Sequence, residues 1–345
     1  GMIQQYFQGE ERGRAFGYFG TTVGVSLGVG PVLGGLLINF AGTDLGWRLT
    51  FLMNVPIGML TIILGLMWFP RPLIKLLRVT SYYATLRSLD PIGALIFTLG
   101  VLCVLLPFMG NQSLFILLLP SSFLLFQLWV KWEKYYSSLG YEPMVDLNIF
   151  RSSNYTNGVL IMSLYFLGKT SIWLLIALYM QQGVGKSAFE TSLVGIPGAL
   201  LTAYASNWAG KRVTYFGRKI VVAGLSFTIF SLLLSIGFIL LHELYQFSIW
   251  WLLFSLAFFG LGQGATTSPN QAITLADVPV AYAGSSGAIM QTAQRVGASV
   301  GIAVITAITF TTVNYFSWTV AIIMGFITII LIITLALLVA VKDLK

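Results

Sequence analysis

Charge is scarce in this sequence of 345 residues. Asp, Glu, Lys and Arg make up only 9% of the chain, against about 25% in soluble domains. Hydrophobic residues make up 57%, and the mean hydropathy is +0.86. One core in a protein of this size cannot bury so large an apolar excess. The composition therefore excludes a soluble globular enzyme and a disordered chain, and it indicates a protein whose solvent is lipid.

Several chemistries lack the residues that they need. Cysteine and histidine each occur once, as Cys103 and His242, which excludes an intrachain disulfide and a multi-histidine metal centre. The sequence contains no GxxxxGK[ST] phosphate loop, so we expect no ATP hydrolysis. Its apolar stretches contain neither a nucleophile–base pair nor a set of metal ligands, so we also expect no enzymatic activity and no cofactor. The net charge of +8 does not indicate a nucleic-acid partner, because the basic residues lie in short gaps between apolar stretches.

The sequence does contain long apolar stretches. A helix needs about 20 apolar residues to cross the hydrocarbon core of a bilayer, and continuous runs of this kind predict an all-α, polytopic helix bundle with about ten spans. The ten stretches are Phe16–Asn39, Leu49–Phe69, Ile92–Met109, Leu114–Trp132, Gly158–Met180, Ser192–Trp208, Ile220–Leu241, Phe247–Pro269, Ala288–Thr311 and Phe316–Val341.

Lys and Arg are distributed unequally between alternate gaps, which predicts the orientation. Cytoplasmic loops carry an excess of basic residues, so both termini of this chain are expected in the cytoplasm. The opposite side holds only Arg48 and Lys186. The basic residues of the predicted cytoplasmic side are Arg12, Arg14, Arg71, Lys75, Arg78, Arg87, Lys131, Lys134, Arg151, Lys211, Arg212, Arg218, Lys219, Lys342 and Lys345.

Glycine recurs at helical spacing in the first stretch. Gly20, Gly24 and Gly28 share one face, and Gly30, Pro31, Gly34 and Gly35 follow. A face without side chains lets another helix backbone approach closely, and Pro31 is expected to bend the helix. Two interpretations remain open. The face is either a tight packing site alone, or an interface that also moves during a transport cycle.

Polar side chains inside apolar stretches raise functional hypotheses, because burying them in hydrocarbon is costly. Lys169 lies in the middle of the fifth stretch, with Tyr165 and Trp173 four residues away on either side. It either faces a watery cavity and contacts substrate, or it is a structural lysine bonded to helix carbonyls.

Two further stretches carry polar residues on one face. The polar residues of the eighth stretch either line a cavity or form hydrogen bonds between helices. In the ninth stretch, Arg295 either lines a cavity or extends its charged end to the membrane interface. No stretch has an acidic residue in its middle. The polar residues are Gln263, Thr267 and Asn270 in the eighth stretch and Gln291, Gln294 and Arg295 in the ninth.

Four segments resemble a known family, in the order in which they occur there. Gly24–Gly35, read GVSLGVGPVLGG, resembles the antiporter motif in the fifth helix of drug:proton antiporters of the major facilitator superfamily. Glu11–Gly17 resembles the approach to that helix. Gly46–Gly58 is similar to the start of the sixth helix in the fourteen-helix branch, and Leu89–Gly93 resembles the start of its extra helix pair.

The resemblance implies a domain organisation. Residues 1–69 would hold the last two helices of an N-terminal bundle, 70–132 two extra linker helices, and 133–345 a six-helix C-terminal bundle. The first four helices of the family would be absent, and with them the membrane acidic residue used in proton exchange. Gly210–Lys219 matches the family's loop motif at Gly217, Arg218 and Lys219, but Thr214 stands where that motif has an acid.

By this resemblance the chain would be a secondary active transporter of the plasma membrane, which exports amphipathic drugs or other small molecules in exchange for protons by alternating access. Its partners would be such a substrate, protons and the lipid bilayer. The alternative is an incomplete or split transporter, inactive unless a separate chain supplies the missing helices.

Overall fold

The computed structural model describes residues 3, 6–68, 90–109, 114–141, 143–276, 278–279 and 283–344, and all regular elements within them are helices. This confirms the predicted all-α class. The predicted basic gap Pro70–Pro91 lies almost wholly outside the described residues. The α-helices are α2 (Gly9–Leu52), α3 (Asn54–Trp68), α5 (Pro91–Met109), α6 (Leu114–Ser138), α7 (Ser153–Leu178), α8 (Ala188–Leu193), α9 (Ile196–Phe216), α10 (Arg218–Tyr245), α11 (Leu252–Thr274), α12 (Ala283–Tyr315) and α13 (Trp318–Lys342).

Seven helical segments within the described residues are long and apolar enough to cross a membrane. The other three predicted stretches also form helices, namely α5, α6 and α8 with α9. They fall short of this criterion because α5 is a short apolar helix, α6 ends in charged residues, and α9 carries Lys211 and Arg212. The seven segments are Gly9–Gly42, Asp44–Trp68, Ser153–Gly183, Arg218–Tyr245, Ile249–Thr274, Ser285–Tyr315 and Trp318–Lys342.

Local sequence signals set several helix ends. The hydroxyl of Ser152 accepts a hydrogen bond from the Tyr155 amide and starts α7, five residues earlier than the apolar stretch predicts. Ser187 and Glu190 form a reciprocal capping box that starts α8. Gly42 has φ +77°, which divides the long α2 segment into two spans, and glycine adopts this left-handed region at little steric cost.

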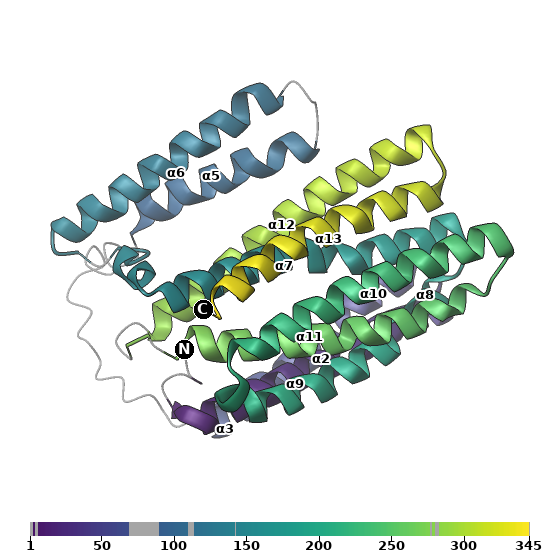
Figure 1. Cartoon of the computed structure of the whole chain (residues 1–345), viewed down its shortest axis with the longest axis horizontal. Coiled ribbons are helices and arrows are strands. Elements are labelled where there is room, and N and C mark those ends of the chain that lie inside the picture. Colours follow the sequence, from purple (N-terminus) through teal and green to yellow (C-terminus); the bar gives the residue numbers. More distant parts are fainter. Residues whose placement is uncertain are drawn as a thin grey trace.

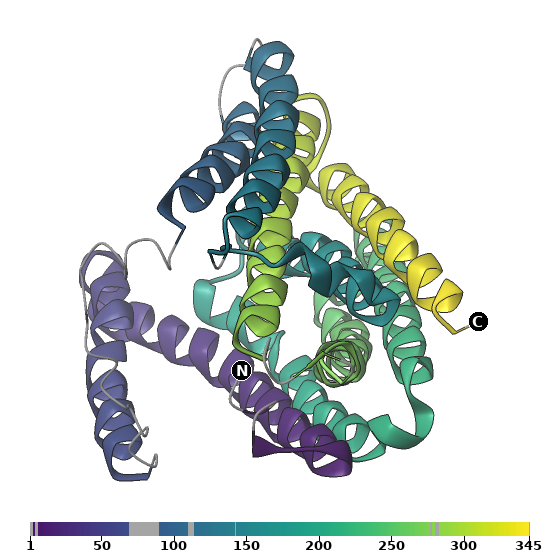
Figure 2. The same ribbon diagram turned by 90° about the vertical axis from the view of Figure 1, so that its left-hand side faces the viewer.

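The helices pack into one large bundle with two appendages (Figure 1). Helices α7, α10, α11, α12 and α13 enclose a buried apolar core that includes Tyr165, Phe259 and Phe326. The α5–α6 pair lies beside α12, and α2 runs along α9 and α11. Helix α3 stands away from the bundle (Figure 2), and none of its residues is buried. Both labelled termini lie at the same end of the molecule, which we call the terminal end.

A line of glycines brings α2 and α9 into close contact. A methyl group added at Gly24 would lie 2.6 Å from the backbone nitrogen of Ala203, and one at Gly28 would lie 2.9 Å from the Ala199 Cβ. One at Gly17 would lie 3.1 Å from the Ser206 carbonyl oxygen. We call this contact, which Gly13 and Gly20 extend, the α2–α9 seam. Another helix backbone therefore approaches the glycine face as the spacing predicts.

The seam leads to a prediction with a matched control on the same helix. We expect Gly24→Ala to lower the free energy of unfolding by about 1–3 kcal/mol, because the added methyl group overpacks the contact with Ala203. Gly30 has open space around its Cα, so Gly30→Ala should leave stability unchanged or raise it by up to about 1 kcal/mol. Thermal or denaturant unfolding in detergent measures both. Equal effects of the two substitutions would contradict the tight seam.

Candidate functional site

A cavity of about 450 Å³ lies between α2 and the helices α7 and α8, away from the terminal end. Three residues of the predicted motif, Pro31, Gly34 and Gly35, form its α2 wall. A methyl group at Gly35 would lie 3.0 Å from the Phe189 Cα, so α2 also approaches α8 closely here. We call this space the α2–α7 cavity. Its lining residues are Leu27, Pro31, Gly34, Gly35, Ile38, Trp173, Ile176, Ala177, Gln181, Ala188, Thr191, Ser192 and Gly195.

Trp173 forms the opposite wall, so the structure brings this predicted site residue together with the motif. Its ring packs edge-to-face on Phe259 with 5.6 Å between ring centres. Its indole Nε1 is buried and has no hydrogen-bond acceptor. A buried donor without a partner is costly, so the hydrogen bonding of this cavity-wall residue is incomplete.

The far end of α7 widens into a π-helix, η2 (Tyr179–Gly183), which the sequence analysis did not predict. The Val184 amide donates to the Tyr179 carbonyl at 2.9 Å, five residues back. Such turns are rare and occur frequently at functional sites. Here the π-helix carries Gln181, the amide side chain of the cavity wall.

Lys169 lies one helical turn from Trp173 on α7 and is partly buried. Its Nζ is 4.4 Å from the ring centre of Phe166 and 6.0 Å from that of Tyr165, so aromatic faces rather than a carboxylate surround the charge. Among the described residues it forms no ion pair. Arg295 of α12 acts on Lys169 as a like charge. Within the part of the chain that the structure describes, Lys169 thus has no acid beside it to compensate its charge.

The other predicted polar residues lie on α11 and α12. Three of them have a buried polar atom without a hydrogen-bond partner: Gln263 Oε1, Thr267 Oγ1 and Gln294 Nε2. Polar atoms of this kind require water or a bound molecule. Gln291 and Arg295 of α12 are exposed, in keeping with a snorkelling position for Arg295.

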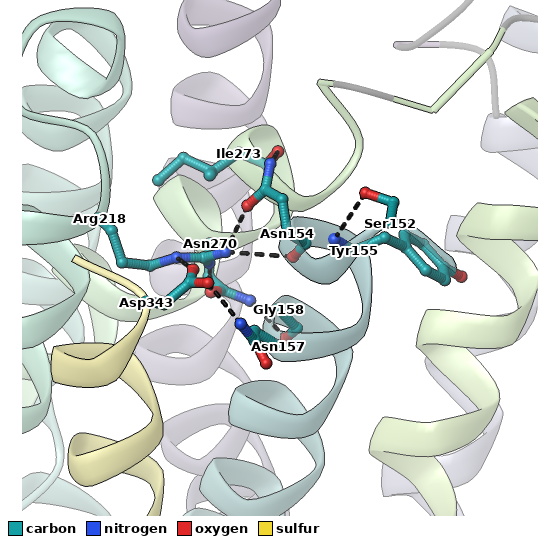
Figure 3. A network of polar contacts seen from close by, with 9 residues as sticks. All are labelled: Ser152, Asn154, Tyr155, Asn157, Gly158, Arg218, Asn270, Ile273 and Asp343. Carbon is teal, nitrogen blue, oxygen red and sulfur yellow. Dashed lines mark hydrogen bonds and ion pairs between the residues drawn. The ribbon is translucent and has the colours of Figure 1, made fainter. Parts of the chain in front are cut away.

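Asn270 is used differently, because it belongs to a buried cluster around Arg218 at the terminal end (Figure 3). Gly217, with φ +54°, separates α9 from α10 and places Arg218 at the start of α10. The guanidinium donates from Nε to Asp343 Oδ2 at 2.7 Å and from another nitrogen to Asn154 Oδ1 at 2.7 Å. It also donates to Asn270 Oδ1.

The partners of Arg218 are themselves held in place. Asn157 donates to the second oxygen of Asp343 at 2.5 Å, and the Asn270 amide nitrogen donates to the Gly158 carbonyl at 2.9 Å. Together these residues form the Arg218 network, which joins α7, α10, α11 and the end of α13 (Figure 3). Each charge in it has a partner, as a buried ion pair requires.

The sequence analysis missed Asn154, Asn157 and Asp343 and interpreted Arg218 as an orientation signal. Asn154 lies 64 residues from Arg218 in the sequence, and Asp343 lies 125 residues away. No local sequence pattern therefore indicates that these residues are in contact. The one available signal was the acidic Asp343 among basic residues of the predicted cytoplasmic side.

A second contact at the terminal end ties α2 to the bundle. Arg12 donates to the carbonyl oxygens of Leu275 at 3.1 Å and Ala276 at 3.4 Å, where α11 ends. The positive guanidinium of Arg12 also interacts favourably with the negative, C-terminal end of the α11 dipole. Arg12 therefore links α2 to the end of α11 at the terminal end, while the α2–α7 cavity lies towards the other end.

Comparison with known proteins gives a family match over nearly the whole chain. The model described as Major Facilitator Superfamily matches residues 1–150 and 158–344. A probable actinorhodin transporter of Streptomyces coelicolor is 28% identical over 90% of this chain and 53% of its own length. A riboflavin transporter of Clostridioides difficile is 28% identical over 88% of this chain and 62% of its own length.

A multidrug resistance protein of Mycobacterium tuberculosis is 26% identical over 86% of this chain and 52% of its own length. The chain thus spans between half and two thirds of the length of these relatives.

The Arg218 network predicts a large stability difference between two adjacent basic residues. Arg218→Gln leaves the largely buried Asp343 carboxylate without its cation, so we expect a loss of about 3–5 kcal/mol in unfolding free energy. Lys219 is exposed, and Lys219→Gln should change stability by less than about 0.5 kcal/mol. Denaturant unfolding in detergent measures the difference. Similar stabilities of the two variants would contradict the structural role of the network.

Proposed function

The chain belongs to the major facilitator superfamily, a family of transporters rather than enzymes, and from that premise we propose that it exports amphipathic small molecules in exchange for protons. The membrane helices and the transporter relatives support transport across a membrane. The export direction and the proton coupling rest on the resemblance of the Gly24–Gly35 segment to the antiporter motif.

The α2–α7 cavity is the observation that carries this proposal. It lies where α2 meets the C-terminal helices, and the motif residues Pro31, Gly34 and Gly35 face Trp173 across it. Transporters of this type place substrate between two groups of helices that rock against each other. The side-chain-free α2–α9 seam beside the cavity provides a contact along which α2 tilts.

The walls of the cavity indicate the class of substrate. Apart from Gln181, Thr191 and Ser192, its lining is aliphatic, aromatic or glycine, which suits a mainly apolar molecule with a few polar groups. The names of related proteins refer to actinorhodin, riboflavin and multidrug resistance, which supports a small organic substrate. Lys169, which has no acid beside it among the described residues, disfavours a purely cationic molecule at that depth.

We propose the predicted domain organisation and orientation for the same transporter. Residues 1–69 then belong to one bundle, 70–132 to a linker pair and 133–345 to the second bundle. Arg12 and the Arg218 network lie at the terminal end, which the basic residues assign to the cytoplasm. The protein would reside in the plasma membrane.

Transport of a fluorescent amphipathic dye tests the cavity. In energised inside-out vesicles we expect Trp173→Ala to reduce dye uptake about 10-fold, equivalent to ~1.4 kcal/mol of lost interaction. Trp208 is partly exposed and lines another surface, so Trp208→Ala is the control and should transport normally. A proton uncoupler should abolish uptake by the wild-type protein. Equal transport by both tryptophan variants would overturn the assignment of the cavity.

Lys169 allows a second transport prediction. Lys169→Met keeps the length and the packing of the side chain, so we expect normal expression and stability but altered dye transport or substrate preference. Lys211 is exposed at the terminal end of α9, and Lys211→Met serves as the control. Unchanged transport by Lys169→Met would leave Lys169 as a structural residue.

A second candidate is a transporter that needs helices beyond those of this chain. None of the α3 residues is buried, although α3 is apolar around its whole circumference. Further helices from a separate chain would cover α3 and the free face of α2. Co-expression of this chain with the N-terminal helices of a full-length relative tests the idea. Transport only in the co-expressing cells would support it, and full transport by this chain alone would contradict it.

A further inference from the structure

Two buried carboxyl groups lie where α5 meets α6, outside the proposed substrate cavity. Asp90 immediately precedes α5 and has no exposed surface, while Glu133 lies near the end of α6 and is 1% exposed. Glu133 follows the apolar stretch Leu114–Trp132, so both groups lie at the border of the predicted membrane region. Acids are rarely buried so completely unless they are paired.

Each carboxyl group has one oxygen that accepts hydrogen bonds. Asp90 Oδ1 accepts from the Gly93 amide at 3.0 Å, which caps α5, and from the Trp132 indole at 2.9 Å. Glu133 Oε2 accepts from the Val145 amide at 3.4 Å. These bonds fix the direction of both side chains and leave one oxygen on each for another partner.

The two remaining oxygens face the same small space. Asp90 Oδ2 and Glu133 Oε1 are buried and have no hydrogen-bond partner. A methyl group added at Gly93 would collide with Asp90 Oδ2 and lie 3.1 Å from Glu133 Oε1. The absence of a side chain at Gly93 thus creates the space that both oxygens share.

Among the described residues, no neighbouring cation balances two negative charges there. In the described part of the chain, neither carboxyl group forms an ion pair. Lys131 and Lys134 on α6 and Arg295 on the adjacent α12 are exposed, and Asp146 in the following segment would add negative charge. Tyr136 is buried and stacks on Trp132. Two ionised carboxylates are therefore unfavourable in this site.

We propose that Asp90 and Glu133 form a proton-binding site that holds one proton between Asp90 Oδ2 and Glu133 Oε1. The protonated carboxyl donates to the carboxylate, which satisfies both buried oxygens and leaves a single negative charge. On release, the proton passes to water, and two like charges then oppose each other between α5 and α6.

The electrostatic setting assigns the proton to Glu133. Burial raises the pKa of the Glu133 carboxyl to about 7, and the Asp90 charge adds to this effect. The amide of Val145 and the indole of Trp129 act in the opposite direction. The Trp129 Nε1 nevertheless lacks the geometry of a hydrogen bond to Glu133.

The site connects to a second cavity through Val145. A space of about 550 Å³ lies between the α5–α6 pair and the helices α7 and α12, and Trp129, Met144 and Val145 are among its lining residues. The proton would therefore control how firmly α5, α6 and the segment after α6 hold together beside this cavity. This inference does not depend on transport, and all of its readouts use the purified protein.

Infrared spectroscopy of the carboxyl groups tests the site in purified wild-type protein. We expect a protonated carboxyl band that disappears with a midpoint near pH 7 and is missing in Glu133→Gln. Asp90→Asn should lower the midpoint by about one pH unit or more, because the like charge is gone. Asp44→Asn removes an exposed carboxyl group outside the α5–α6 pair, so it is the control and should titrate as wild type.

Thermal stability gives an independent readout with a defined sign. The pKa of Glu133 is higher in the folded protein than in the unfolded chain, so stability is present at low pH and is lost as pH rises through about 7. The melting temperature of Glu133→Gln should not fall with pH over that range, because the amide stays neutral. A midpoint that Asp90→Asn leaves unchanged, or the absence of a protonated band in the wild type, would overturn the shared proton.

Discussion

The close approach of α2 and α9 is the constraint on which the rest of the structure depends. Lipid provides no hydrophobic driving force between helices, so backbone packing determines where α2 lies. A methyl group at Gly24 would already touch the Ala203 backbone, and no larger side chain fits. This contact fixes the height and rotation of α2, so that Pro31, Gly34 and Gly35 face Trp173 and Arg12 reaches the end of α11.

The buried polar groups of this protein differ in how many of their charges and polar atoms have a partner. Arg218 has partners for its charge, and the result is a fixed joint between four helices. Lys169 has aromatic rings but no acid among the described residues, so its charge remains available. Asp90 and Glu133 each have one satisfied and one unsatisfied oxygen. The number of missing partners therefore separates Arg218, which supports the fold, from the groups for which we propose a ligand or a proton.

Sequence patterns predicted the features that depend on neighbours along the chain. Apolar length predicted the helices, and glycine spacing predicted the side-chain-free face of α2. The i, i+4 spacing of Lys169 and Trp173 predicted that they share one side of α7. The Arg218 network was not predictable in this way, because an arginine beside Lys219 looks like any loop cation until Asp343, 125 residues later, packs against it. The pairing of Asp90 with Glu133 was missed for the same reason.

The π-helix η2, which follows α7, changes the direction in which the side chains beyond Tyr179 lie relative to those of α7. An α-helix turns by about 100° per residue, so residues eight positions apart, such as Trp173 and Gln181, differ in direction by about 80° on a regular helix. The wider turn that begins at Tyr179 rotates less per residue and brings Gln181 back towards the side of Trp173. The position of Gln181 in the cavity wall thus depends on one extra residue in one helical turn. If that turn tightened to α geometry, Gln181 would swing away while the tryptophan stayed in place.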